Sequence, residues 1–150
     1  GVIQINFGSS VLTKAARDYG NASQQAMIRF RAEEHASLDE TRMAEFAANY
    51  RKENPYPYAT VDDVLDHIDR AVELAGIDHV GLGSDYDGVG DSLPVGLKDV
   101  SEHPNLVNGM LGRGYSEEDV AKVLGGNLMR VWAAAEAYAA ATGNPPKCTL

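Results

Sequence analysis

The stretch His79-Val80-Gly81-Leu82-Gly83-Ser84-Asp85-Tyr86-Asp87-Gly88 decides how the rest of the chain is interpreted. Residues 79–84 predict a β-strand, and the two glycines inside it mark a close approach of another backbone or of a ligand. Residues 85–91 predict a loop. The first seven residues predict another strand, because most of them favour extended backbone: Val2, Ile3, Ile5 and Phe7.

The segment between these two strands is predicted to be largely helical. Thr60-x-x-Asp63 opens the clearest helix, Gly76 ends it, and its buried stripe comprises Val61, Val64, Leu65, Ile68, Val72 and Ala75. Residues 22–53 are also predicted to be helical, and Ser37-x-x-Glu40 has the pattern of a capping box that divides them in two. Residues 54–58 contain two prolines and predict an extended loop.

Three short helices are predicted after the second strand. One lies near residues 105–112, one follows Ser116, and the last spans residues 127–142. The pair Gly125-Gly126 predicts a tight turn before the last helix. This helix has an apolar face, and we expect the aromatic side chains on it to belong to the core: Trp132 and Tyr138.

The order strand, helices, strand, helices predicts parallel strands joined by crossover helices. Parallel sheets are buried on both faces and normally contain more than two strands. We therefore expect residues 1–150 to be the C-terminal portion of a larger α/β fold, most simply a (β/α)₈ barrel, and to be incomplete alone.

Composition excludes several classes of protein. The net charge of −9 argues against nucleic acid as a partner, because phosphates require basic patches. The single cysteine, Cys148, excludes an intrachain disulfide framework and a cysteine-cluster metal site. No stretch approaches the roughly 18 consecutive apolar residues of a membrane-spanning helix. No pattern of a signal peptide is present.

Active sites of such barrels lie at the C-terminal ends of the strands. The first strand ends in Asn6-Phe7-Gly8, which is polar but matches no catalytic pattern. The second strand is followed directly by Asp85, which can act as a general acid or base or help to hold a metal-bound water. The alternative is that Asp85 caps backbone amides in a turn, as loop aspartates commonly do.

Two other metal patterns are absent from the sequence. The loop after Asp85 superficially resembles a calcium loop, but Val89 and Gly96 occupy positions that need ligands. The four histidines show no metal-ligand spacing, so we expect each to be a surface or structural residue: His35, His67, His79 and His103. We place His67 on the polar side of its helix.

Four blocks in order make the chain recognisable: residues 79–88, 94–101, 113–119 and 124–131. They closely resemble the C-terminal part of the membrane (renal) dipeptidase family of zinc peptidases. The resemblance covers nearly the whole chain and is weakest over residues 9–55. It implies an amidohydrolase-like (β/α)₈ barrel in which this chain supplies the seventh and eighth strands.

The resemblance also implies an activity and a set of site residues. The family hydrolyses dipeptides, including those with a C-terminal D-residue, and uses two zinc ions bridged by a glutamate and a water. The family's catalytic aspartate matches Asp85, which would accept a proton from that water and pass it to the leaving amine. Gly88 matches a position that lines the substrate pocket, and Asp87 and Tyr86 flank these two as further expected substrate contacts.

The family's zinc ligands correspond to positions upstream of Gly1, so we expect no metal ligand in this chain. Its partners would be the dipeptide, the missing N-terminal part of the barrel and, as a further candidate, a second copy of the protein. Two alternatives stay open. The chain is an inactive truncated remnant, or it is a partner-binding module that pairs its exposed strands with another protein.

Overall fold

The computed structural model describes residues 1–33 and 39–143 and contains a small parallel sheet. Strand β1 (Ile3–Asn6) pairs with β2 (Val80–Ser84), as predicted, with Ile3 opposite Val80 and Ile5 opposite Leu82. A Cβ added at Gly83 would lie 3.3 Å from the backbone carbonyl carbon and oxygen of Gln4. The glycine in β2 therefore permits the close approach of β1.

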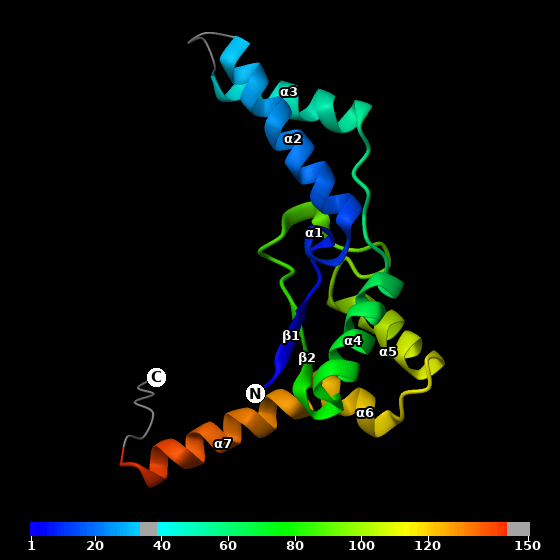
Figure 1. The fold of residues 1–150 in the computed structure, drawn as a ribbon, viewed down its shortest axis with the longest axis vertical. Coiled ribbons are helices and arrows are strands. Elements are labelled where there is room, and N and C mark those ends of the chain that lie inside the picture. The colour runs from blue at the N-terminus through cyan, green and yellow to red at the C-terminus, as the bar shows by residue number, and fades with distance from the viewer. Residues whose placement is uncertain (34–38, 144–150) are drawn as a thin grey trace.

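Three helices follow β1: α1 (Ser9–Leu12), α2 (Lys14–Glu33) and α3 (Glu40–Glu53). Figure 1 shows α2 and α3 as a hairpin that projects away from the sheet. The predicted start at residue 22 is wrong, because Thr13 Oγ1 accepts a hydrogen bond from Ala16 N and the helix begins there. Ser37 lies outside the described residues. Asp39 is the N-cap of α3, which makes Glu40 the first helical residue and not the third.

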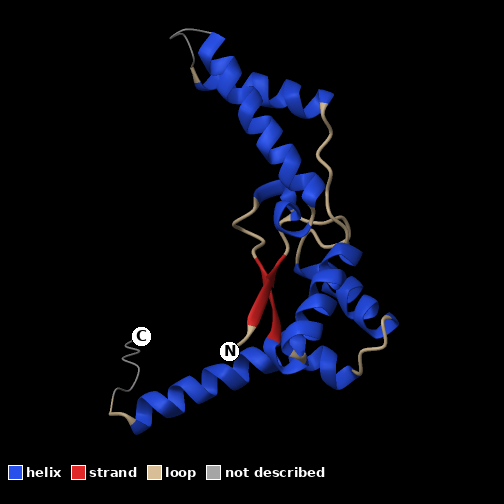
Figure 2. Cartoon of the chain, in the orientation of Figure 1, coloured by secondary structure: helices blue, strands red, loops and turns tan. Residues whose placement is uncertain are grey.

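Helix α4 (Val61–Ala75) confirms the clearest prediction. Thr60 and Asp63 form the expected capping box, and four side chains of its inner face are buried: Val64, Leu65, Ile68 and Ala71. Figure 2 shows α4 on one side of the two strands. The core there also includes Phe7 from the end of β1, Leu97, Leu106 and Met110. The sheet stays open, and Ile3 on β1 is 49% exposed.

A short 3₁₀ turn at Ile77–His79 leads into β2, and the chain after β2 contains two more, at Gly90–Ser92 and Val100–Glu102, and then three helices. These are α5 (His103–Gly112), α6 (Glu117–Ala121) and α7 (Asn127–Ala141). The turn predicted at Gly125-Gly126 is present as a kink: residues Lys122–Gly126 form a π-helical segment between α6 and α7, and Gly125 within it has non-helical angles, φ 165° and ψ −20°. A Cβ at Gly126 would lie 3.1 Å from the Ala121 carbonyl oxygen, which explains the small residue inside this junction.

Helix α7 extends away from the rest of the chain (Figure 1). The prediction that its aromatic side chains belong to the core is wrong for this chain, because Trp132 is 58% exposed and Tyr138 is 73% exposed. The apolar face is present, but no described element covers it. None of the helices in residues 1–33 and 39–143 combines the length and apolarity that crossing a membrane requires.

Asn127, at the start of α7, forms hydrogen bonds to the backbone around the start of β2. Its side chain is 2% exposed, and Nδ2 donates to the carbonyl oxygens of Ile77 at 2.7 Å and Val80 at 2.9 Å. Replacing Asn127 with alanine is expected to lower the free energy of unfolding of the full-length protein by about 1–3 kcal/mol, because the buried bond to Val80 and the part-buried bond to Ile77 lose their donor.

Urea denaturation of the full-length protein would measure this loss. Asn105→Ala is the matched control, because the exposed amide of Asn105 also donates to a carbonyl, that of Gly96, at 2.9 Å. A loss for Asn127→Ala no larger than that of the control would show that the two hydrogen bonds of Asn127 are not important for stability.

Candidate active site

Two residues 79 positions apart in the chain meet where the strands end. Asn6 is the last residue of β1, and Asp85 follows the last residue of β2. Asn6 Nδ2 donates a hydrogen bond to Asp85 Oδ2 at 2.8 Å. The amide oxygen of Asn6 accepts the backbone N–H of Gly8 at 2.7 Å. Asp85 is exposed to solvent. Its carboxylate is nevertheless held by the Asn6 side chain, which is itself fixed by the backbone N–H of Gly8.

The backbone at the end of β2 is irregular in a way that directs this carboxylate. A bulge lies between Ile5 and Asn6, so that Asn6 pairs with Ser84. Ser84 and Asp85 both have positive φ angles, 49° and 69°. Two consecutive left-handed residues that are not glycine are costly, and such strain clusters at functional sites. Bulges next to active sites commonly redirect a side chain.

Gly88 lies directly against Asp85. Its N–H donates to the Asp85 carbonyl oxygen at 3.2 Å, which closes a tight turn. A Cβ added at Gly88 would lie 2.1 Å from Asp85 Oδ1 and 2.9 Å from its carboxyl carbon. Any side chain at this position would therefore displace the carboxylate. The structure brings together Asp85 and Gly88, which were predicted to share a site.

Tyr86 and Asp87 lie in different surroundings. The Tyr86 ring packs edge-on against Phe7 with centroids 5.9 Å apart, and its hydroxyl donates to the Asp99 carbonyl oxygen at 3.1 Å. Burial, with a smaller effect of the Asp99 and Glu102 charges, raises the pKa of Tyr86 to about 12, so the phenol stays protonated at neutral pH. Asp87 is exposed to solvent. Both remain predicted substrate contacts.

The described histidines have structural surroundings and do not come together. His67 Nε2 lies 2.9 Å from the Leu12 carbonyl oxygen and the residue is half-buried, so its placement on the polar side of its helix was wrong. His79 Nδ1 lies 2.8 Å from the Gly1 carbonyl oxygen. The His103 ring packs near Tyr86, and its Nε2 is buried with no hydrogen-bond partner among the described residues. His35 lies outside those residues.

Zinc does not fit the residues that the structure describes. Within 1–33 and 39–143, no three His, Cys, Asp or Glu side chains come together in a group that could hold a metal ion. Asp85 therefore has no such group beside it in these ranges.

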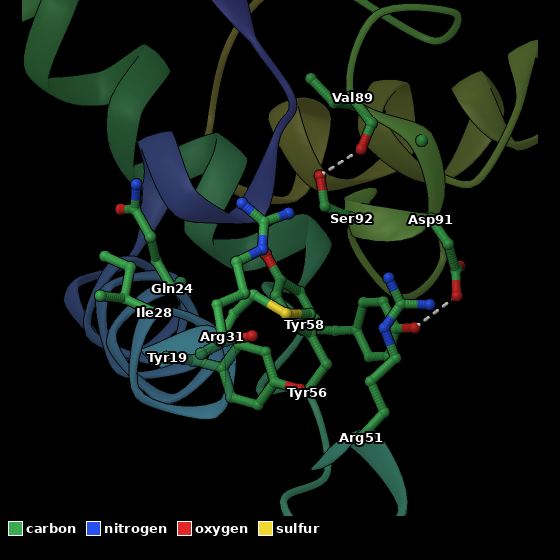
Figure 3. A pocket seen from close by; sticks show the side chains of 14 residues that line it. Tyr19, Gln24, Ile28, Arg31, Arg51, Tyr56, Tyr58, Val89, Asp91 and Ser92 are labelled. Atoms are coloured by element: carbon green, nitrogen blue, oxygen red, sulfur yellow. Dashed lines mark hydrogen bonds between the residues drawn. The ribbon is translucent and has the colours of Figure 1, made fainter. Parts of the chain in front are cut away.

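A cleft of about 770 Å³ adjoins the loop that follows β2, and the sequence did not predict it. Figure 3 shows Arg31 from α2 and Arg51 from α3 among its tyrosines, and Val89 to Ser92 line its other side. Tyr58 donates a hydrogen bond of 2.8 Å to Asp91, which is the largest cause of the raised pKa of this phenol. Guanidinium and phenol groups together are suited to hydrogen-bonding an anionic group.

The model of the family described as Membrane dipeptidase (Peptidase family M19) matches residues 1–146. The chain belongs to the membrane dipeptidase family. The resemblance and the fold class predicted from the sequence are thereby confirmed, since the open two-stranded sheet corresponds to part of a dipeptidase barrel.

Individual members of the dipeptidase family are similar over part of their length. Dipeptidase tcpJ of Claviceps purpurea is 48% identical over 82 residues, which are 55% of this chain and 19% of that protein. Dipeptidase aclJ of Aspergillus oryzae is 49% identical over 73 residues, which are 49% of this chain and 17% of that protein. The matched segments thus span less than a fifth of these relatives.

A solved dipeptidase structure extends the match to most of the chain. The crystal structure of the probable dipeptidase PvdM from Pseudomonas aeruginosa has a TM-score of 0.63 and 31% sequence identity to this chain. The match covers 88% of this chain and 36% of that one. The arrangement of the two strands and their helices is therefore that of a portion of a dipeptidase.

Proposed function

We propose that the protein to which this chain belongs is a zinc-dependent dipeptidase in which Asp85 is the catalytic acid and base. The observation that supports this most directly is the placement of Asp85, since its carboxylate follows β2 and contacts both Asn6 and Gly88. This is the strand end at which barrel enzymes carry out their chemistry. The two zinc ions are part of the proposal, with ligands outside the described part of this chain.

The residues of this chain would supply proton transfer. Hydrolysis forms a C–O bond from water to the scissile carbonyl carbon and breaks the C–N bond. Asp85, as a carboxylate, would accept the proton of the attacking water and deliver it to the nitrogen of the leaving amine. The hydrogen bond from Asn6 lowers the basicity of Oδ2, so we assign the transfer to Oδ1, the other oxygen of this carboxylate.

We assign the substrate contacts of this chain to the turn after Asp85. Gly88 brings backbone close to the reacting centre, and its lack of a side chain leaves room beside Oδ1. Asp87 and Tyr86 flank that position. The proposed substrates are dipeptides, including those with a D-residue at the C-terminus, as membership of the dipeptidase family suggests.

A partner-binding module is the second candidate function. The exposed apolar face of α7 favours it, since Leu128 and Trp132 are 43% and 58% exposed in this chain. Exposed apolar patches on soluble proteins often mark interaction sites. An inactive remnant would keep the same sequence without the chemistry.

A dipeptide panel separates these proposals. The full-length protein is expected to hydrolyse dipeptides with L- and D-residues at the C-terminus, to lose activity with a chelator and to regain it with zinc. The 150-residue chain alone is expected to show no hydrolysis, because Asp85 has no metal site beside it in the described residues.

Absence of hydrolysis by the zinc-loaded full-length protein would reject the dipeptidase proposal and leave the remnant or the binding module. Chelator-sensitive hydrolysis by the isolated chain would instead show that metal ligands come from within these residues or from a second copy.

A further inference from the structure

We propose that Asn6 is a positioning residue that fixes the Asp85 carboxylate through Oδ2 and leaves Oδ1 as the proton-accepting atom. This inference rests on the proposed catalytic role of Asp85. Asn6 is the last residue of β1, has no reacting group of its own and would act only through Asp85.

The orientation of the Asn6 amide is determined by its two hydrogen bonds. Its oxygen accepts the Gly8 N–H at 2.7 Å, and its nitrogen therefore faces Asp85, donating to Oδ2 at 2.8 Å. A backbone N–H can only donate, so the reverse orientation of the amide would place two donors against each other at Gly8. The amide of Asn6 cannot rotate without losing both bonds.

The bulge in the sheet brings Asn6 within reach of Asp85. In a regular continuation of the register, Asn6 would lie opposite Gly83, but the irregularity after Ile5 moves its partner to Ser84. The next residue is Asp85, and its φ of 69° shows that the backbone leaves the extended conformation of the strand here. Phe7 N still donates to the Ser84 carbonyl oxygen at 3.0 Å, so the two strand ends remain joined beyond the bulge.

Asp85 is exposed, so its side chain depends on neighbouring groups for a fixed position. Asn6 holds one carboxylate oxygen, and the backbone of Gly88 lies against the other, since an added Cβ would be 2.1 Å from Oδ1. A carboxylate held on both sides loses little freedom when it reacts. Prior orientation of a catalytic group is worth large factors in rate, which makes a positioning role measurable.

A double-mutant cycle with Asp85→Asn tests this inference in the full-length, zinc-loaded enzyme. Asn6→Ala is expected to lower kcat about 10–100-fold, the scale of misplacing a catalytic group by about 1 Å, with KM and zinc content unchanged. Asn6→Ala in the Asp85→Asn background is expected to cause no further loss, because the group that Asn6 positions no longer reacts.

Asn105→Ala is the control, since it removes a side-chain donor to the Gly96 carbonyl in another loop and is expected to keep the wild-type kcat. A merely structural role for Asn6 would lower kcat by the same factor with and without Asp85, and that additivity would overturn the inference. A wild-type kcat for Asn6→Ala would overturn it as well.

Crystal structures keep the inference distinct from the proposed function. If the wild-type protein hydrolyses no dipeptide, the dipeptidase proposal fails on that result alone. The Asn6→Ala structure then decides the role of Asn6, because we expect the Asp85 carboxylate to leave its wild-type rotamer. An unchanged, singly ordered Asp85 would show that Asn6 does not position it.

Discussion

Replacing Asp85 with asparagine in the full-length enzyme is expected to lower kcat about 10²–10⁴-fold, the usual contribution of a general acid and base. The substitution preserves the shape of the side chain, and the Asn6 amide can still donate to the new amide oxygen. What is lost is the ability to accept a proton from water and return it to the leaving amine. Steady-state kinetics and metal analysis of the same preparation would test this expectation.

Zinc content is the decisive second measurement for Asp85→Asn. We expect it to match the wild type, because no described residue joins Asp85 in a group that could hold a metal ion. Loss of zinc together with activity would make Asp85 a ligand and would contradict its assigned role. Asp18→Asn is the control, since Asp18 is an exposed carboxylate on α2 that pairs with Lys14 and is expected to keep full activity.

Sequence patterns within a few residues correctly predicted the elements that depend on contacts between residues close together in the chain. The capping box at Thr60 and the inner stripe of α4 need only residues a few positions apart, and both are present. The parallel pairing of β1 and β2 followed from the helical crossover between them. Helix α7 shows where such reasoning fails. Its apolar face was assigned to the core, but periodicity reports that a face is apolar and not whether this chain covers it.

The candidate site was partly predictable for the same reason. Asp85 could be found because it follows a strand, and Gly88 because it matches a family position. Asn6 could not, since its partner is 79 residues away and their contact depends on a bulge that has no sequence signature. The half-buried His67 was likewise misplaced, because its contact is the Leu12 carbonyl oxygen, 55 residues away in the sequence.

Gly88→Ala is expected to lower kcat about 10–100-fold in the full-length enzyme, because displacing a catalytic group by about 1 Å has effects of this size. The new Cβ would lie 2.1 Å from Asp85 Oδ1 in the present geometry, so the carboxylate must move. The contact is with a side chain and not with backbone, so we expect the protein to fold and bind zinc normally. The hydrogen bond from the N–H of residue 88 to the Asp85 carbonyl oxygen is expected to remain, since alanine also has a backbone N–H.

Gly112→Ala provides the matched control, because Gly112 ends α5 and an added Cβ there meets nothing within 4 Å. Its kcat should equal that of the wild type. The effect of Gly88→Ala should also vanish in the Asp85→Asn background, where the displaced group no longer transfers the proton. A raised KM with unchanged kcat, in both backgrounds, would instead assign Gly88 to substrate binding alone. A Gly88→Ala enzyme with wild-type kcat would show that proton transfer does not depend on the present position of the Asp85 carboxylate against Gly88, which would contradict this prediction.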